Sequence, residues 1–308
     1  MTKVSAVVPT YERVDKLERS LGSIINQTYN DLELLVVDDN TSEEYRDKVE
    51  KIVKETSKKA DFHIERIINE GNQGVSSARN LGIENATAEY IAFLDDDDEW
   101  KPKKIEKQVQ KIQEEGINAV YTASEMYDGE VKDIVRKTPG LDLEALLERD
   151  RIGSPSKVMI EKEWLERVGG FDEEIPSGED WDLWIRLLEV GCNFGYVDTP
   201  LARYHRDNES KSNKFDVATE GREKVTEKHS KLLEEAGKKV RARHHLNRAK
   251  KQYTLGDRKG TKKHLTKTLK NNLLEFEAYV LAAIYLTRRL TGVDIIPVAV
   301  KIKSRFFK

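Results

Sequence analysis

The N-terminal part of the chain alternates short apolar runs with longer stretches in which apolar residues recur at helical spacing. The apolar runs are Val4 to Val8, Leu32 to Val37, Phe62 to Ile68 and Tyr90 to Leu94. After the first run, Val14, Leu17 and Leu21 follow the helical period, and the same period returns after the second run. Near-continuous apolar strands that alternate with helices predict an α/β fold, with a mainly parallel sheet covered by helices on both faces.

Polar residues stand at the carboxyl ends of these predicted strands, where open α/β sheets bind their ligands. The first run ends in Pro9 to Tyr11, the second in Asp38 to Ser42, and the third leads into Asn72 to Asn80. The fourth run ends in aspartates. We therefore expect a ligand site at one edge of the sheet, built from the ends of several strands.

Four adjacent aspartates, Asp95 to Asp98, follow the fourth predicted strand. Because their charges repel one another, they suit the tip of a buried strand, where an ion or a cationic ligand offsets the repulsion. Mg²⁺ or Mn²⁺ binds one or two protein carboxylates and completes its coordination with water and phosphate oxygens. An isolated acidic run is usually a solvated loop, but beside these polar strand ends it indicates a metal and diphosphate site.

Five short motifs, in order over residues 1 to 206, resemble those of the family 2 glycosyltransferases, which are inverting enzymes with the GT-A fold. The motifs are VVPTYER, QTYNDLELLVVDDNTS, NQGVSSARNLGI, YIAFLDDDDEWKP and GEDWDLWIRL. Five motifs in the right order on an α/β pattern are hard to obtain by chance. The resemblance implies a GT-A, Rossmann-like sheet of the nucleotide-diphospho-sugar transferase type for residues 1–210.

The same resemblance implies the activity. A single sugar moves from a UDP- or GDP-type nucleotide sugar to a hydroxyl acceptor, either polyprenyl-phosphate-linked or a glycan, in cell-surface glycan or glycoprotein glycan assembly, with Mg²⁺ or Mn²⁺ as cofactor. Single addition is expected because the processive synthases of the family carry a Q-x-x-R-W motif and membrane helices, both missing from this sequence. Loop shape around residues 124 to 156 selects donor and acceptor, and no motif encodes it.

The resemblance assigns nucleotide-sugar binding to Pro9, Thr10, Tyr11, Glu12, Asp39, Asn72, Gly74, Arg79, Asp95 and Asp96. Among these, Thr10 and Tyr11 offer a backbone contact and a stacking face, while Asp39 accepts from a uracil or guanine N–H. In the alternative interpretation, Asp39 caps the helix expected near Ser42, a role that Asp38 or Ser42 itself also suits.

Arg79 lies on the helix that opens after Gly74. Its planar guanidinium is suited to the ribose or the diphosphate, because the fork of N–H donors matches phosphate oxygens. The alternative is a surface ion pair with Glu84. The sequence favours neither interpretation over the other.

Within the acidic run, the family's D-x-D corresponds to Asp95-Asp96-Asp97, with Asp97 as the implied metal ligand and Asp95 or Asp96 near the ribose and the metal-bound waters. His205, after an expected final strand, matches a histidine that many GT-A enzymes place near the metal or phosphate. A lone histidine is more often an ordinary packed or surface residue. Asp98 is interpreted as the cap of the following helix, which fits a proline in the first turn of that helix.

The catalytic base is expected in the GEDWDLW segment. An inverting transfer is a single displacement in which an acceptor hydroxyl attacks the anomeric carbon, so the hydroxyl needs a carboxylate within hydrogen-bond reach. The resemblance assigns this base to Asp180. In the alternative, Glu179 and Asp180 form the acidic first turn of the next helix, which the helix macrodipole favours. Both interpretations can hold, since a base on a rigid helix start is well positioned.

Composition limits the setting. A chain of 308 residues accommodates one large domain and a smaller one. Cys192 is the single cysteine, which excludes an intrachain disulfide and suits the reducing cytoplasm. The N-terminus lacks the layout of a signal peptide, and no apolar run reaches the length of about 18 residues that a membrane-spanning helix needs.

Charge is divided unevenly along the chain. Residues 211–308 hold 25 Lys and Arg against 10 Asp and Glu, a net charge of +15, whereas residues 1–210 carry −18, which gives the total of −3. Composition shifts at Asp207 to Ser210. The asymmetry predicts a separate basic module, residues 211–308, that faces an anionic partner. Nucleic acid is not expected as that partner, because no RNA or DNA recognition motif is present.

Helical spacing continues throughout this module, and one helix pair around Ala249 and Leu265 resembles a tetratricopeptide unit. The segments Tyr279 to Leu286 and Ile295 to Val300 are apolar and flanked by cations, and the chain ends in Phe306, Phe307 and Lys308. This pattern is typical of an interfacial anchor on anionic lipid, at the cytoplasmic membrane face. In the alternative interpretation, these helices pack on the catalytic domain or in a homodimer.

Other functions fit the sequence less well. A Rossmann dehydrogenase and a P-loop enzyme are disfavoured, because neither G-x-G-x-x-G nor G-K-[ST] follows the first strand. A nucleotidyltransferase of similar fold fits the segment Gly178 to Trp184 poorly. The last alternative is a catalytically silent nucleotide-sugar-binding or assembly protein, and the presence of Asp97 and Asp180 argues against it.

Overall fold

The computed structural model describes residues 2–71, 73–136, 141–205 and 215–291. The chain divides into two compact units, the first of residues 1–143 and 151–225 and the second of residues 144–150 and 226–308. The sequence placed the boundary at residue 210, where the charge changes. The units divide at residue 225 instead, because the next helix packs on the first unit: a Cβ added at Gly221 would lie 1.9 Å from the carbonyl oxygen of Ser177.

The strands of the first unit are β1 (Val4–Thr10), β2 (Leu32–Asp38), β3 (His63–Ile68), β4 (Tyr90–Phe93), β5 (Glu99–Trp100), β6 (Ala119–Tyr127), β7 (Val131–Val135), β8 (Val158–Glu161) and β9 (Phe194–His205). Its helices are α1 (Val14–Ile25), α2 (Glu43–Ser57), α3 (Val75–Asn85), α4 (Lys104–Glu115), the 3₁₀ turn η1 (Pro155–Lys157), α6 (Lys162–Arg167), α7 (Glu179–Glu189) and most of α8 (Phe215–Lys228). Strands β1 to β4 confirm the four apolar runs predicted from the sequence.

The strands form one sheet in the order β3-β2-β1-β4-β8-β6-β9-β5, with β7 paired to β6. Strands β1 to β4 are parallel to one another, and β6 is parallel to β9. Strands β5, β7 and β8 each pair antiparallel to their neighbours. The sheet therefore contains more antiparallel strands than the sequence predicted. Two of these strands show no apolar run in the sequence, because β5 has only 2 residues and β7 is almost wholly exposed.

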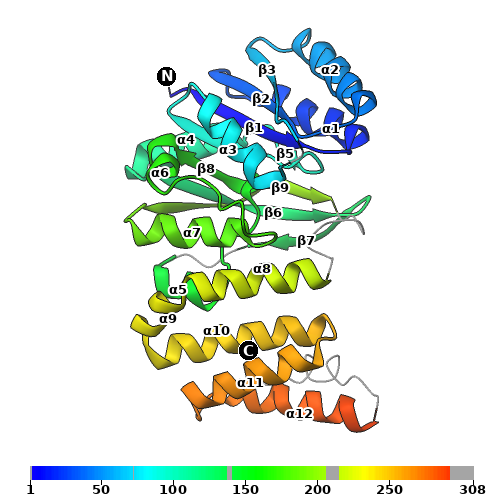
Figure 1. Cartoon of the computed structure of the whole chain (residues 1–308). Coiled ribbons are helices and arrows are strands. Elements are labelled where there is room, and N and C mark those ends of the chain that lie inside the picture. The colour runs from blue at the N-terminus through cyan, green and yellow to red at the C-terminus, as the bar shows by residue number, and fades with distance from the viewer. Residues whose placement is uncertain (1, 72, 137–140, 206–214, 292–308) are drawn as a thin grey trace. The chain divides into compact units, whose positions relative to one another are not determined.

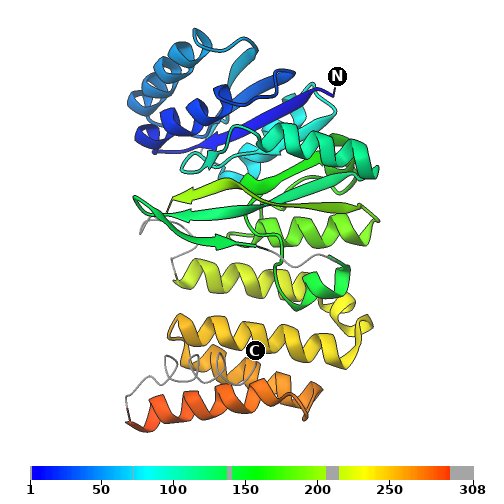
Figure 2. The ribbon, with the colours of Figure 1, turned by 180° about the vertical axis from the view of Figure 1, so that it is seen from behind.

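Helices cover both faces of the sheet, as Figures 1 and 2 show from opposite sides. One face packs against α1, α2 and α4 through side chains such as Leu21, Val49 and Val109. On the other face, α3 lies so close that a Cβ added at Gly82 would come within 2.3 Å of the Val7 side chain. Since successive strand residues point to opposite faces, β1 and β2 contribute alternate side chains to two core layers.

The second unit is helical, as predicted, and contains the end of α8, most of α5 (Leu143–Glu148), α9 (Ser230–Glu235), α10 (Gly237–Thr254), α11 (Arg258–Asn271) and α12 (Phe276–Thr291). Helices α10 and α11 form a pair joined by Gly256, at φ +83°, and by Asp257, which caps α11 by accepting the Gly260 N–H. Helix α12 packs on this pair, and the shared core consists of Leu246, Ala249, Tyr253, Leu265, Ala278, Leu281 and Ile284.

Helix α12 is apolar on both sides over Tyr279 to Leu286, as the sequence predicted, but only one side is buried. Leu281 and Ile284 are buried, whereas Tyr279 is 48% and Leu286 is 50% exposed. The segment Ile295 to Lys308, which the sequence also assigned to a membrane anchor, lies outside the described residues. Among the residues that the structure describes, no helix is long and apolar enough to cross a membrane.

Candidate active site

The carboxyl ends of β1, β2 and β4 meet at one edge of the sheet, as predicted. Thr10, the last residue of β1, donates its hydroxyl to Asp96 Oδ2 at 2.9 Å, and its carbonyl accepts the Asp39 N–H at 3.0 Å. Residues from three strand ends therefore share one hydrogen-bonded group. Pro9, also assigned to nucleotide binding, is buried within β1.

In the acidic run, Asp96 and Asp98 are buried and Asp95 and Asp97 are half-buried, and the run carries a surplus of negative charge. Burial and the neighbouring Asp97 raise the pKa of Asp96 to about 7. Burial and Asp95 likewise raise the pKa of Asp97. Arg13 offsets part of this charge, with Nη1 3.3 Å from Asp96 Oδ1 and 2.5 Å from Asp97 Oδ2. Crowded carboxylates of this kind favour a divalent cation, which removes their repulsion.

The residues fit a cation that the substrate helps to hold. In the described part of the chain, no group of three or more metal-ligating side chains is preformed. Mg²⁺ or Mn²⁺ requires only one or two protein carboxylates, and Asp96 and Asp97 both stand beside Arg13. His205, the second predicted ligand, places Nε2 3.1 Å from Glu99 Oε2 and stands edge-on to the Tyr127 ring. Glu99, which the sequence analysis did not single out, therefore joins His205 beside the acidic run.

Asp98 does not cap the following helix, so the sequence prediction was wrong here. The strand β5 comes directly after it, and the N-cap residue of α4 is Lys103. Asp98 instead accepts the Ser156 hydroxyl at 2.6 Å, and the same hydroxyl accepts the Asp95 N–H at 3.1 Å. Burial raises the pKa of Asp98 well above its usual range. Asp98 thus ties the acidic run to η1.

Arg79 links the acidic run to the start of α7. Its side chain is 4% exposed, and it places Nη2 2.6 Å from Asp95 Oδ1 and Nη1 3.0 Å from Glu179 Oε1. Burial lowers the pKa of Arg79, but the two carboxylates outweigh it and raise the pKa above its ordinary value. The expected alternative, a surface pair with Glu84, is wrong. The diphosphate contact stays a prediction.

Asp39 holds the loop that precedes α3. Its buried carboxylate accepts the Asn69 side-chain amide at 2.8 Å and the N–H groups of Gln73 and Gly74 at 3.0 Å each. Gly74 adopts φ +97°, which favours glycine. The alternative role of Asp39 as the cap of α2 is wrong, and Ser42 at that N-cap position makes no side-chain cap bond. Base binding by Asp39 stays a prediction.

Two further predicted nucleotide contacts follow β1. Tyr11 is partly exposed, so its ring is accessible as a stacking face. Glu12 adopts φ 53°, and its N–H donates to Asn40 Oδ1 at 2.8 Å. A left-handed backbone at a non-glycine residue costs on the order of 1–3 kcal/mol and is concentrated at functional sites. The hydrogen bond to Asn40, which follows β2, holds the turn at Glu12 in place.

Asp180 lies in the first turn of α7, which begins after Gly178 at φ +87°. Its Oδ1 accepts the Trp181 N–H at 2.7 Å, and the residue is partly exposed. Asp182, two residues further along, is buried and pairs with Arg186 at 2.8 Å. Asp180 is therefore accessible on a rigid helix start, a position that suits a base and also satisfies the helix dipole.

Some residues of the site were missed by the sequence analysis. Ser154 donates its hydroxyl to Asp95 Oδ2 at 3.3 Å, and Arg19 Nη2 donates to the carbonyl of Asp97 at 2.8 Å. Arg13 stands in the motif VVPTYER, which is a signal that could have identified it. Ser154 lies in a loop without periodicity, and Arg19 follows the ordinary pattern of a surface helix, so only the fold identifies them.

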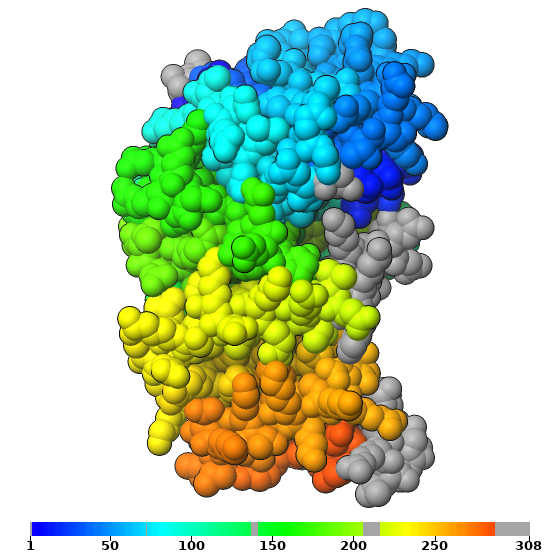
Figure 3. Space-filling model, in the orientation of Figure 1, coloured from blue at the N-terminus to red at the C-terminus, as the bar shows by residue number. Residues whose placement is uncertain are grey.

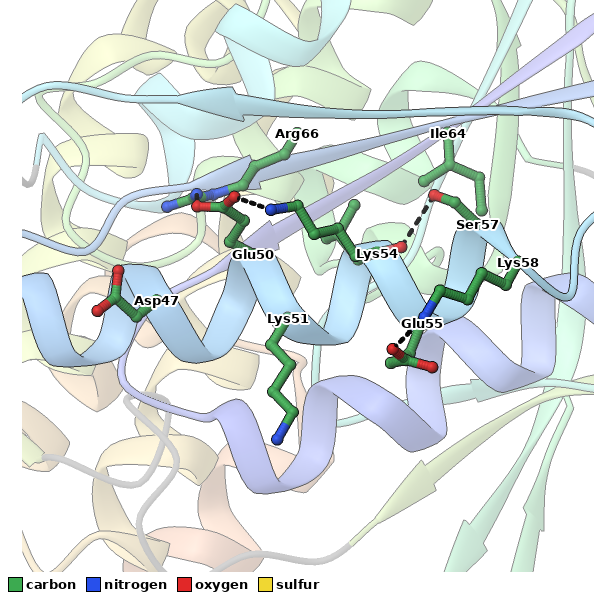
Figure 4. Close-up of a pocket in the computed structure, with 10 residues that line it drawn as sticks. Asp47, Glu50, Lys51, Lys54, Glu55, Ser57, Lys58, Ile64 and Arg66 are labelled. Atoms are coloured by element: carbon green, nitrogen blue, oxygen red, sulfur yellow. Dashed lines mark hydrogen bonds and ion pairs between the residues drawn. The ribbon is translucent and has the colours of Figure 1, made fainter.

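A pocket of about 720 Å³ lies between α2 and β3, lined mostly by charged side chains (Figure 4). Lys54 and Arg66 both pair with Glu50 there. Arg66 also reaches Asp38 at 2.6 Å, so Asp38 does not cap α2 either. None of the strand-end residues described above lines this pocket, so it is not the candidate site.

Residues 5–171 match the family described as Glycosyl transferase family 2. TuaG of Bacillus subtilis, a glycosyltransferase named for teichuronic acid biosynthesis, is 30% identical over 219 residues, which are 70% of this chain and 84% of TuaG. WfgD of Escherichia coli, named as a UDP-Glc:alpha-D-GlcNAc-diphosphoundecaprenol beta-1,3-glucosyltransferase, is 30% identical over 220 residues, 69% of this chain and 81% of WfgD.

The solved structure of the mannosyltransferase PcManGT from Pyrobaculum calidifontis, in complex with GDP-Man and Mn²⁺, matches with a TM-score of 0.58. The match covers 99% of this chain and 88% of PcManGT, at 18% sequence identity. At this level of identity the similarity establishes the fold, which is the GT-A fold predicted from the sequence.

Proposed function

The chain belongs to glycosyl transferase family 2, and we propose that it is an inverting, metal-dependent hexosyltransferase. Its donor is a UDP- or GDP-type nucleotide sugar, and its acceptor is a hydroxyl of a lipid-linked saccharide or a glycan in cell-surface glycan assembly. The name of WfgD, with a UDP-glucose donor and a diphosphoundecaprenol-linked acceptor, and the GDP-Man and Mn²⁺ in the PcManGT complex support this proposal.

One contact carries the proposal: the buried Arg79 guanidinium joins Asp95 to Glu179, at 2.6 and 3.0 Å. Asp95 belongs to the acidic run assigned to the donor and the metal. Glu179 directly precedes Asp180, the proposed base, in the first turn of α7. This contact supports the proposal that the carboxylates assigned to the donor and the proposed base belong to one site.

The reaction is a single displacement at the anomeric carbon. The acceptor hydroxyl oxygen bonds to this carbon while the bond to the diphosphate oxygen breaks, and the nucleoside diphosphate departs with the bonding electrons. Asp180 accepts the hydroxyl proton as general base. Asp97 and His205 would hold Mg²⁺ or Mn²⁺, with Asp95 or Asp96 near the ribose and the metal-bound waters, and the cation would supply positive charge to the leaving diphosphate.

The nucleotide is expected at the ends of β1 and β2. Tyr11 offers the stacking face there, and Asp39 accepts a base N–H besides its loop bonds, since each carboxylate oxygen has two lone pairs. Gly74 leaves open space, because nothing lies within 4 Å of an added Cβ. Glu12 borders the same turn. Asn72, which the resemblance assigns to this site, lies outside the described residues.

Substitution of Asp97 by alanine is expected to abolish the Mn²⁺-dependent stabilisation by nucleoside diphosphate, because the carboxylate that would hold the metal is lost. A bound ligand raises apparent stability by mass action, so thermal unfolding with and without Mn²⁺ measures the effect. Asp61→Ala, at an exposed position in the loop before β3, is the matched control. Unchanged metal-dependent stabilisation in Asp97→Ala would remove this residue from the site.

Gly221→Ala is expected to shift the start of α7 and with it Asp180, the proposed base. The new Cβ would meet the carbonyl oxygen of Ser177 at 1.9 Å, so the loop that precedes α7 must shift. Overpacking of this kind costs about 1–3 kcal/mol, and we expect lower melting temperature and turnover. Gly22→Ala, whose Cβ meets nothing within 4 Å, is the control. Equal melting temperature and turnover of the two variants would mean that α8 does not position α7.

The proposed function is tested with a panel of nucleotide sugars and Mn²⁺, first by thermal shift and then by donor turnover with polyprenyl-diphosphate-linked acceptors. Release of nucleoside diphosphate together with a glycosylated acceptor supports it. Pyrophosphate released from a nucleoside triphosphate would identify a nucleotidyltransferase. Donor binding without turnover on any acceptor tested would favour a catalytically silent binding protein.

A further inference from the structure

In the second unit, large apolar side chains are exposed at the turn between α11 and α12 and along α12. Leu273 is 70%, Leu274 is 90% and Phe276 is 66% exposed. Tyr279, Val280 and Leu286 continue this surface along α12 at helical spacing. These six residues are called here the apolar patch; its four members on α12 lie on the opposite side of the helix from Ala278, Leu281 and Ile284. Contiguous exposed apolar surface of this kind marks a site of interaction.

Local hydrogen bonds hold the turn in a defined conformation. Asn272 Oδ1 accepts the Leu274 N–H at 3.0 Å, and the Tyr279 hydroxyl donates to the carbonyl of Leu273 at 2.9 Å. The side chains of Leu273 and Leu274 are therefore presented to solvent by an ordered turn, and their exposure follows from the fold.

Helix α11, which leads directly into the patch, is basic along its whole length. Its sequence RKGTKKHLTKTLKN contains one arginine and five lysines and no acidic residue. The basic residues are all exposed, whereas Thr261, His264, Leu265 and Thr268 form the buried side. Lys270 precedes Leu273 by only three positions. Figure 3 shows this segment in orange at the surface of the second unit.

The acidic residues that the structure describes near the patch are engaged within the unit. Glu277 forms an ion pair with Lys250, and Glu275 accepts the Asn272 side-chain amide at 3.3 Å. These contacts leave the positive charge of α11 dominant beside the apolar patch. The surface thus combines protruding apolar side chains with a strip of cations.

We propose that the apolar patch and α11 together dock this protein on an anionic lipid membrane. Apolar side chains enter the headgroup boundary, and lysines attract anionic headgroups. A protein partner is disfavoured because lysine is depleted at protein–protein interfaces, whereas here it makes up most of the charged strip. The proposal moves the anchor from the chain end to the turn between α11 and α12, and it goes beyond the transfer reaction.

Co-sedimentation of the full chain with vesicles tests the proposal without any assay of transfer. Phosphatidylglycerol-containing vesicles are expected to bind the chain, pure phosphatidylcholine vesicles to bind it far less, and added salt to weaken binding. Leu274→Glu with Phe276→Glu should lower partitioning by roughly ten- to a hundred-fold, from lost apolar burial. The control Val131→Glu with Ile134→Glu alters two exposed apolar residues of β7 in the first unit and should bind as the unaltered chain does.

A second pair of variants separates charge from apolar burial. Lys267→Glu with Lys270→Glu should weaken binding at least roughly five-fold per lysine, from the loss of headgroup attraction. Lys51→Glu with Lys107→Glu changes the net charge equally on exposed helices of the first unit and should have little effect.

Equal binding to anionic and neutral vesicles would overturn the proposal, and so would unaltered binding of Leu274→Glu with Phe276→Glu. Analytical ultracentrifugation measures whether the chain forms a dimer through the apolar patch. A dimer that this variant abolishes, with vesicle binding unchanged, would assign the patch to a second copy of the chain and not to lipid. Because the substituted residues are exposed, the melting temperatures of these variants should match that of the unaltered protein.

Discussion

Asp180→Asn is expected to lower turnover by about 10²–10⁴-fold, the usual contribution of a general base. Asparagine keeps the size of the side chain and can still accept the Trp181 N–H, which Asp180 Oδ1 accepts at 2.7 Å. It cannot take the proton of an acceptor hydroxyl at neutral pH. The measurement is the initial rate of nucleoside diphosphate release at saturating donor and acceptor, together with donor affinity, which should barely change.

Glu189→Gln provides the control for this prediction, because it makes the same chemical change at the exposed other end of α7. The rate of the Glu189→Gln variant should match that of the unaltered enzyme. Near-normal turnover in Asp180→Asn would show that another carboxylate is the base. Glu179 is then the first candidate, since Asp182 is buried and paired with Arg186.

Arg79→Met is expected to reduce the free energy of unfolding by about 3–5 kcal/mol, the range for breaking a buried ion pair from one side. Methionine fills much of the volume but leaves Asp95 and Glu179 without their shared cation. Donor binding and turnover should fall as well, because these carboxylates are then free to separate. Arg79→Lys should be intermediate, since a single ammonium cannot bridge two carboxylates as the guanidinium fork does.

Urea unfolding followed by tryptophan fluorescence measures this change, because all 4 tryptophans lie in the first unit. Arg167→Met serves as control, since its partner Glu163 is 67% exposed and exposed pairs contribute about 0–1 kcal/mol. If Arg79→Met were no less stable than Arg167→Met, the link between the acidic run and α7 would not contribute to stability.

Local pattern predicted the framework of the site well. The four parallel strands, the position of the acidic run after β4 and the helix that starts at Glu179 follow from periodicity and strand-end chemistry. The motif order added the family and the GT-A fold. Asp39, Asp95 and Asp96 were therefore expected at one edge of the sheet, and Thr10 indeed contacts both β2 and the acidic run.

Long-range partners were predicted poorly, because no local pattern records them. Arg79 and Glu179 are 100 residues apart and meet only after α3 and α7 have packed. Asp98 looked like a helix cap because it precedes a helical stretch, yet Ser156 from a loop without periodicity holds it. Asp39 similarly looked like a cap of α2, and the folded chain turns it toward the loop before α3.

The sequence by itself determined the four parallel strands with their helices, the family, and a basic helical C-terminal module, because these depend on residue order, spacing and composition. The tertiary structure decided which carboxylates lose their solvent and which cations stand beside them, because desolvation and Coulomb energy depend on distances that only packing sets. It also decided that one side of α12 is core while Leu273, Leu274 and Phe276 face solvent. The sequence of an apolar segment does not show whether other helices bury one side of it or leave it fully exposed.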